Sequence, residues 1–186
     1  MPGANTPPQL ALLPAPLLAW YGANARDLPW RREPTPYHVF VSELMLQQTR
    51  VAAVLEHYRR FMEELPTVQA LAACPEDRLM KLWQGLGYYS RARNLQKAAR
   101  QVMEEFGGEF PGEFAALRTL SGVGDYTAGA VASIAFGRAV PAVDGNVLRV
   151  VSRLTADCRD MASPPVRRQV AGALEAVMPR DRPGDF

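Results

Sequence analysis

The stretch Leu120–Ala130, which reads LSGVGDYTAGA, contains a glycine turn that joins two expected helices. Gly122 and Gly124 stand on either side of one apolar residue, and glycine allows the positive φ angles that a tight turn needs. The backbone amides of such a turn, together with the N-terminus of the next helix, form an anion site that suits a phosphate. An ordinary helix–helix turn, in which Val123 fills the core, explains the same residues. On its own, the turn favours this plainer interpretation.

Helical periodicity runs through the chain, and no run of alternating β-branched residues between hairpin turns indicates a strand. The apolar positions predict about ten short helices. They cover Leu17–Trp20 at the end of an N-terminal helix, Tyr37–Thr49, Arg50–Leu65, Val68–Ala73, Glu76–Gln84, Ser90–Phe106, Phe114–Leu120, Tyr126–Phe136, Gly145–Thr155 and Pro165–Met178. The sequence therefore predicts an all-α protein.

Length and composition bound the protein class. The 186 residues suffice for one well-buried domain or for two small lobes that share a cleft. A formal net charge of +2 does not indicate a nucleic-acid binder, so such contacts would come from local clusters. Cys74 and Cys158 argue for two buried free thiols in a reducing cytosol and against a disulfide scaffold. The apolar segment Leu10–Trp20 is too short to span a membrane and lacks the preceding basic residues of a signal peptide. We therefore expect a cytoplasmic protein.

One carboxylate, Glu43, lies in the helix expected over Tyr37–Thr49, which is apolar almost all round. Ser42, Gln47 and Gln48 could form a polar strip with it, and Glu43 and Gln47 share a helix face because they are four residues apart. A carboxyl on such a strip, opening into a cleft, would have a pKa raised by desolvation, which suits a general acid. A half-exposed helix with Glu43 facing solvent explains the sequence equally well.

A second carboxylate, Asp144, follows the glycine turn by about twenty residues and precedes the helix expected over Gly145–Thr155. Aspartate is favoured at this position because its oxygens accept from the first amides of the helix. A capped aspartate also stays ionised, as an electrostatic role in a reaction requires. The structural and the catalytic interpretation are therefore compatible.

Several long blocks, in the right order, resemble the adenine DNA glycosylases of the helix-hairpin-helix, or endonuclease III, superfamily. Besides LSGVGDYTAGA, the blocks are Leu28–Trp30 (LPW), Thr35–Tyr37 (TPY), Ser42–Thr49 (SELMLQQT), Leu82–Tyr89 (LWQGLGYY), Arg91–Leu95 (RARNL) and Val143–Val147 (VDGNV). The resemblance runs from about Leu17 to the C-terminus. It implies a two-lobed, all-α enzyme with its active site between the lobes. Such an enzyme flips an adenine mispaired with 8-oxoguanine or guanine out of the DNA stack and hydrolyses its N-glycosidic bond.

The resemblance also assigns roles to residues. Glu43 would protonate nitrogen 7 of the adenine, and Asp144 would stabilise the oxocarbenium-like sugar. The residues expected to line the substrate pocket are Trp30, Arg31, Tyr126 and Asn146. The residues expected to contact DNA are Gln48, Tyr88, Gly122, Val123, Gly124, Arg91 and Arg93. Among these, Tyr88 would wedge into the base stack and Gln48 would lie near the opposite base. Arg91 and Arg93, with Lys97 and Arg100, would form a phosphate-facing stripe, for which a solvated helix face is an equally good explanation.

Tyr126 occupies the position after the glycine turn at which bifunctional relatives carry a lysine. Without that amine no Schiff base forms, so we expect base removal without strand cleavage. A rival enzyme is an endonuclease III-like glycosylase that acts on oxidised pyrimidines, against which Glu43 and Tyr126 both argue. A rival of another class is a non-catalytic helix-hairpin-helix module that only binds DNA.

The expected organisation has four parts. Residues 1–9 form a disordered lead-in, 10–27 an N-terminal helix packed on the second lobe, 28–137 a helical barrel with the helix-hairpin-helix at 120–130, and 138–186 an incomplete second lobe. Related sequences continue with four cysteines that hold a 4Fe-4S cluster and with a domain that reads 8-oxoguanine. Those cysteines are absent here, so we expect a C-terminally truncated, weakly active chain without a metal site.

We further expect a monomer with no membrane contact. Its partner would be double-stranded DNA that contains an adenine mispair, with which it would associate at the nucleoid. Without the missing segment, the apolar side chains of the last helix, Val170, Leu174 and Val177, should be exposed.

Overall fold

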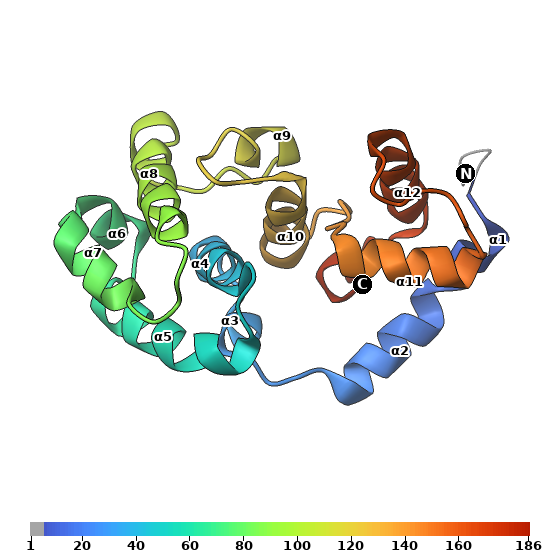
Figure 1. Ribbon diagram of the computed structural model, residues 1–186, viewed down its shortest axis with the longest axis horizontal. Coiled ribbons are helices and arrows are strands. Elements are labelled where there is room, and N and C mark those ends of the chain that lie inside the picture. Colours follow the sequence, from blue (N-terminus) through green and yellow to red (C-terminus); the bar gives the residue numbers. More distant parts are fainter. Residues whose placement is uncertain (1–5) are drawn as a thin grey trace.

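The computed structural model describes residues 6–186, and in this range all regular structure is helical. The helices are α1 (Pro8–Ala11), α2 (Pro14–Asn24), α3 (Pro29–Arg32), α4 (Pro36–Leu46), α5 (Val51–Glu64), α6 (Val68–Ala73), α7 (Glu76–Trp83), α8 (Ser90–Glu105), α9 (Phe114–Leu117), α10 (Asp125–Phe136), α11 (Gly145–Thr155), α12 (Pro164–Val177) and the 3₁₀ turn η1 (Pro183–Asp185). They form two lobes, with α3–α10 in one and α1, α11 and α12 in the other (Figure 1). The expectation of a two-lobed, all-α protein is confirmed.

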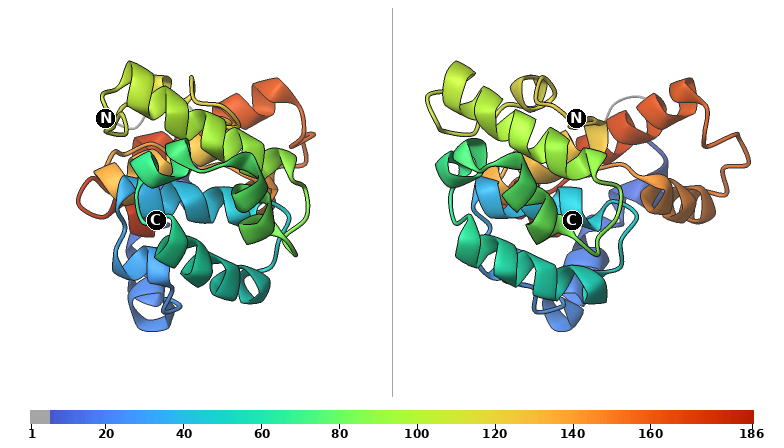
Figure 2. Two further views of the ribbon diagram at one scale, coloured as in Figure 1. Left: turned by 90° about the vertical axis from the view of Figure 1, so that its left-hand side faces the viewer. Right: turned by 60° about the vertical axis from the view of Figure 1, so that its left-hand side comes forward.

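The main lobe is built around α4, whose apolar residues leave no polar face. Phe40, Val41 and Met45 are fully buried, and α4 packs against α5, α8 and α10. Figure 2 shows it enclosed by the surrounding helices. In α10 the small residues allow close approach, since a Cβ on Gly129 would lie 2.6 Å from the backbone oxygen of Pro141. The segment that follows α10 therefore lies directly against it.

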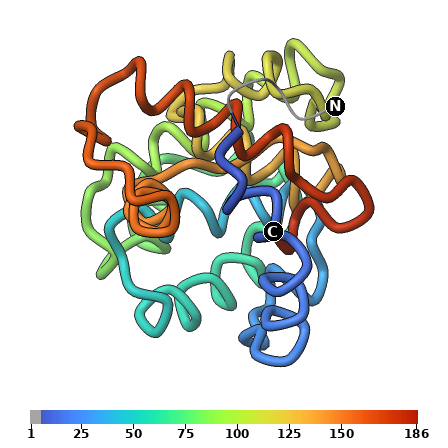
Figure 3. Tube along the Cα trace, turned by 90° about the vertical axis from the view of Figure 1, so that its right-hand side faces the viewer, coloured from blue at the N-terminus to red at the C-terminus, as the bar shows by residue number. Residues whose placement is uncertain are grey.

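The second lobe has its own core. Leu10 of α1, Leu148 of α11 and Val170 and Leu174 of α12 are each at most 5% exposed. The first helix of the chain, α1, lies against α12 in Figure 3, which explains this burial. The expected exposure of Val170 and Leu174 is thus wrong, because Leu10 covers them, and Val177 is partly buried in the same cluster.

Several expected boundaries need correction. The lead-in over residues 1–9 is wrong at its end, because α1 begins at Pro8, while residues 1–5 lie outside the described range. The N-terminal helix α2 continues to Asn24, past Trp20, and buries none of its side chains, so α1 provides the packing on the second lobe. α4 ends at Leu46, before the expected Thr49, because Gln47 leaves the helical conformation with a ψ of 112°, and Gln48 then takes a left-handed φ of 58°. In residues 6–186 no helix has the length and apolar character needed to cross a membrane.

Candidate active site

Glu43 lies in the middle of α4 and is 8% exposed. The helix begins with Thr35, whose hydroxyl oxygen accepts from the amide of His38 at 3.2 Å. The polar strip expected beside Glu43 does not form. Ser42 donates its hydroxyl to the carbonyl of Val39 in its own helix, at 2.8 Å, and Gln47 lies beyond the helix end. Glu43 is therefore a buried carboxyl in an apolar helix.

The environment of Glu43 favours its protonated form. Burial raises the pKa of this carboxyl above its usual range, and the negative charge of Asp144 acts in the same direction. A hydrogen bond from Tyr126 and the positive charge of Arg31 oppose this effect on the pKa without reversing it. Four residues expected at the active site, from α3, α4, α10 and the start of α11, thus influence one another.

Tyr126 is the second residue of α10 and is 37% exposed. Burial, followed by the negative charges of Glu43 and Asp144, raises the pKa of its hydroxyl. The hydroxyl consequently keeps its proton and acts as a donor toward Glu43. Because the side chain at this position is a phenol and has no amine, it cannot form a Schiff base.

Asp144 caps α11 as expected. Its Oδ1 accepts from the backbone amides of Asn146 at 2.9 Å and Val147 at 2.8 Å, and its Oδ2 accepts from Nδ2 of Asn146 at 2.9 Å. Asn146 therefore holds the carboxylate with both its backbone and its side chain. Asn146 therefore orients the carboxylate at the start of α11.

Arg31 and Trp30 differ in their surroundings although they are adjacent in α3. Nη1 of Arg31 donates to the carbonyl of Gly184 at 2.6 Å, which ties the end of the chain to the helix that precedes the active site. Trp30 is 3% exposed and packs edge-on against Tyr58, with ring centroids 5.0 Å apart. The structure thus accounts for Trp30 as a core side chain.

The glycine turn plays its plainer role in the structure, and the N-terminus of α10 beside it is open. Val123 is buried in the main core, as the plainer interpretation requires. Gly122 has a φ of 77°, and a Cβ there would lie 2.7 Å from the Cβ of Asn94, so glycine is needed. Gly124 has an ordinary φ of −92°, which corrects the expectation of a second positive angle. It forms the N-cap of α10, and the space around it is open, as an anion site requires.

Comparison with known proteins agrees with this geometry. Residues 41–175 match the family described as HhH-GPD superfamily base excision DNA repair protein. The chain belongs to this family. Among curated relatives, it is 49% identical over 179 residues to the adenine DNA glycosylase of Homo sapiens, covering 91% of this chain and 33% of that protein. The adenine DNA glycosylase of Mycobacterium tuberculosis (strain CDC 1551 / Oshkosh) is 40% identical over 172 residues, covering 91% of this chain and 56% of that protein.

Solved structures share the fold. A thermostable thymine-DNA glycosylase is 26% identical with a TM-score of 0.86, covering 96% of this chain and 82% of that one. A trapped endonuclease III–DNA covalent intermediate is 27% identical with a TM-score of 0.74, covering 89% of this chain and 75% of that one. The expected superfamily and fold are confirmed.

Two loops of this HhH-GPD chain carry Tyr88, which is expected to wedge into the DNA stack, and Gln48, which is expected to lie near the opposite base. Gln48 follows α4 and is exposed, and Tyr88 precedes α8 and is 64% exposed. Both adopt left-handed backbone angles, with φ of 58° and 47° respectively, which non-glycine residues rarely do. The sequence contains no signal for this conformation, because neither position holds glycine or asparagine.

Arg91 is not in a phosphate-facing stripe, which corrects the expectation for this residue. Its side chain is buried, at 7% exposed, and its guanidinium donates to acceptors in the two loops just described. A signal for this was available, since Arg91 stands four residues before Leu95 and so shares the buried face of α8. Arg93 lies on the exposed face and pairs with Glu76 at 2.7 Å. Lys97 and Arg100 are exposed on the same face, and Arg100 donates to the carbonyl of Ala72.

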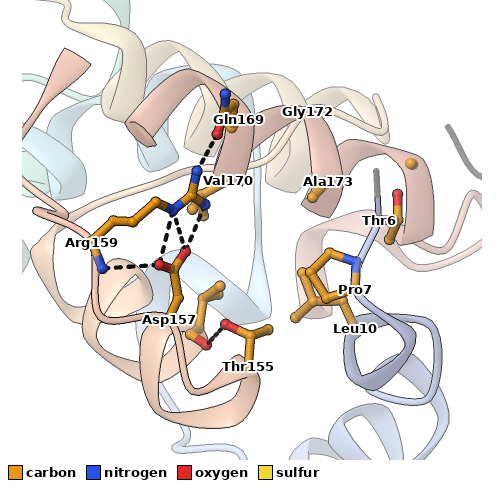
Figure 4. Close-up of a pocket in the computed structure, with 12 residues that line it drawn as sticks. Thr6, Pro7, Leu10, Thr155, Asp157, Arg159, Gln169, Val170, Gly172 and Ala173 are labelled. Atoms are coloured by element: carbon orange, nitrogen blue, oxygen red, sulfur yellow. Dashed lines mark hydrogen bonds and ion pairs between the residues drawn. The ribbon is translucent and has the colours of Figure 1, made fainter. Parts of the chain in front are cut away.

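Two cavities are lined by residues of the second lobe. One, of about 850 Å³, lies between the start of α10 and α12 and is lined in part by Gly124, Tyr126 and Arg168, so it adjoins the active site. The other, of about 560 Å³, lies within the second lobe. Figure 4 shows that Arg159 on its wall is already bound by Asp157 and Gln169. Its charged lining is thus neutralised within the protein.

The residues of this chain do not fit an iron–sulfur cluster. Within residues 6–186 no group of three or more histidine, cysteine, aspartate or glutamate side chains could hold a metal ion. Cys74 is buried in the main core as expected, whereas Cys158 is exposed after α11, which corrects the expectation of two buried thiols. The two thiols lie in different lobes and do not form a common cluster site. The reaction proposed for this chain therefore uses no cluster.

Proposed function

We propose that the chain hydrolyses the N-glycosidic bond of adenine mispaired with 8-oxoguanine or guanine in double-stranded DNA. The observation that carries this proposal is the buried carboxyl of Glu43, whose raised pKa is coupled to Tyr126 and Asp144. The names of the curated relatives support adenine as the base. The chain spans a third of the human relative and about half of the bacterial one, so the activity is inferred for this part alone.

DNA binding begins at the helix hairpin. The amides of the turn at Gly122 and Gly124 take a backbone phosphate without reading a base. Tyr88 and Gln48 enter the stack from their two loops, and the adenine flips out toward the cleft between the lobes. The solved endonuclease III structures contain DNA, which supports DNA as the partner of this fold.

The chemistry then uses two carboxyl groups in different protonation states. Glu43, whose pKa is raised by burial, transfers its proton to nitrogen 7 of the adenine, which makes the base a better leaving group. The bond between the base and the sugar breaks with oxocarbenium character, and the carboxylate of Asp144 stabilises the positive sugar. Water then adds to the sugar, so the products are free adenine and an abasic site.

Tyr126 limits the reaction to base removal. Its hydroxyl donates toward Glu43 and offers no amine for a Schiff base, so the strand stays intact. Since all these groups come from a single chain, we infer that a monomer suffices. We place it in the cytoplasm, on the nucleoid when DNA is bound.

The test is a single-turnover excision assay on a duplex with one adenine opposite 8-oxoguanine. We expect an abasic site at the adenine, revealed as a strand break only after alkali, and no break before it. A parallel duplex with an oxidised pyrimidine tests the endonuclease III-like alternative. Binding without excision of either base would instead identify a DNA-binding module.

A further inference from the structure

One buried arginine connects the two loops that flank the DNA-facing side of the main lobe. Nη1 of Arg91 donates to the carbonyls of Leu44, Met45 and Gln47 at 2.9, 2.8 and 2.6 Å. Its Nη2 donates to Oγ1 of Thr49 at 3.1 Å and to the carbonyls of Leu86 and Gly87 at 2.9 and 3.2 Å. A single guanidinium thus holds the end of α4 and the segment before α8.

These acceptors flank the two left-handed residues. The acceptors Gln47 and Thr49 stand directly before and after Gln48, while Gly87 stands directly before Tyr88. A left-handed non-glycine residue persists only where the surrounding structure enforces its conformation. The contacts of Arg91 provide that enforcement at both positions.

The guanidinium is itself held rigidly. Its Cζ lies 5.5 Å from the ring centroid of Trp83 and 5.6 Å from that of Tyr88, within the range of cation–π attraction. Trp83 in turn donates from Nε1 to the carbonyl of Gly87 at 3.1 Å. A lysine has one donor group instead of a planar fork and could not serve both loops at once.

We propose that Arg91 is a positioning residue for base unstacking, because it fixes the spacing and the backbone conformation of Gln48 and Tyr88. The inference rests on the proposed function, in which these two side chains enter the DNA stack. It assigns Arg91 no contact with DNA and no part in the chemical step.

The first measurement is equilibrium unstacking. A duplex carries the fluorescent base 2-aminopurine in place of the target adenine, and all proteins carry Glu43→Gln so that the base is not removed. We expect bright fluorescence with the parent protein and less than a third of that rise with Arg91→Lys at saturating protein. The matched control is Val102→Ala, which removes a fully buried side chain further along the same helix and should leave the fluorescence rise unchanged.

The second measurement is excision with Glu43 restored. On the mispaired duplex, Arg91→Lys should lower the single-turnover rate by about 100-fold, the effect of a misplacement of about 1 Å. On a duplex in which the adenine faces an abasic-site analogue, and is already unstacked, the loss should shrink to less than about tenfold. A residue needed only for folding would lower both rates alike, and that outcome overturns the inference.

A milder variant decides the matter where Arg91→Lys does not fold. Thr49→Val keeps the size of the side chain and removes one of the six acceptors. It should lower unstacking in the same direction by a smaller factor, and an unchanged fluorescence rise contradicts the inference. If the parent protein unstacks the base without excising it, the proposed function fails, while the positioning role is still decided by the fluorescence of the variants.

Discussion

Glu43 and Arg91 are charged residues buried to the same degree in the main lobe, yet they have opposite surroundings. Their exposed fractions are 8% and 7%. Arg91 has six hydrogen-bond acceptors, most of them backbone carbonyls, whereas the pKa of Glu43 is raised by burial that its neighbours do not offset. The comparison shows that partners, rather than burial, decide whether a buried charge supports the fold or the chemistry.

The largest effect should come from Glu43→Gln. It removes the proton donor and leaves the shape of the site, so the single-turnover excision rate should fall by about 100- to 10,000-fold. DNA affinity, measured by anisotropy on the same mispaired duplex, should stay within about threefold. Near-parental excision by this variant would show that Glu43 takes no part in the chemical step.

Glu43→Gln should also change how the free energy of unfolding depends on pH. Because the pKa of Glu43 is higher in the folded protein, the folded protein binds more protons between the ordinary glutamate pKa and the raised one. The free energy of unfolding of the parent should therefore fall as pH rises through this range. Glu43→Gln should remove that part of the pH dependence, as followed by urea denaturation at a series of pH values.

Arg91→Met tests whether the buried guanidinium stabilises the fold. It leaves buried carbonyls of two loops without a donor, so the free energy of unfolding should fall by about 3 kcal/mol. The matched control is Arg93→Met on the exposed face of α8, where loss of a surface ion pair should cost about 0–1 kcal/mol. Equal, small losses for both variants would mean that the buried guanidinium contributes little to the fold.

The sequence predicts the periodic part of the molecule well and its loops poorly. The apolar spacing in α5, α8 and α11 locates these helices within a residue or two of their bounds. It does not foresee α1 and α3, because each is a four-residue helix that begins with proline and lacks a period. The left-handed angles at Gln48 and Tyr88 come from contacts distant in sequence, which no local pattern encodes.

The active site was predictable in part for the same reason. Asp144 stands at a capping position that local chemistry defines, and the structure places it there. The spacing of the apolar residues in α8 places Arg91 on the buried face of this helix. We expect it on the surface from its residue type, because arginine is mostly exposed in proteins. Glu43 depended on which face of α4 it occupied, and residues alone left that question open.

Gly124→Asp should weaken DNA binding without changing either of the buried residues Glu43 and Arg91. The open space around this glycine admits the side chain, but its negative charge would stand at the proposed phosphate site. DNA affinity should fall by about three- to tenfold, equally for mispaired and fully paired duplexes, because phosphate contacts carry no base information. A loss confined to the mispaired duplex would indicate that the turn reads a base.

Tyr126→Phe should have the smallest effect, and it tests how Tyr126 contributes to the pKa of Glu43. The variant removes a hydrogen bond that lowers the pKa of Glu43, so that pKa should rise further. Since the protonated acid is the active form, the loss of excision rate at high pH should begin at a higher pH than in the parent. A shift of this limb to lower pH would contradict the direction of the Tyr126 contribution.

Burial holds the pKa of Glu43 above that of an ordinary glutamate, which is about 4.3. The most direct test of this raised pKa is a pH titration of the side-chain carboxyl carbons by ¹³C NMR in glutamate-labelled protein, with Glu43→Gln to identify the resonance. We expect the resonance lost in that variant to titrate above all those of the surface glutamates. A resonance of Glu43 that titrates with or below them would contradict the account.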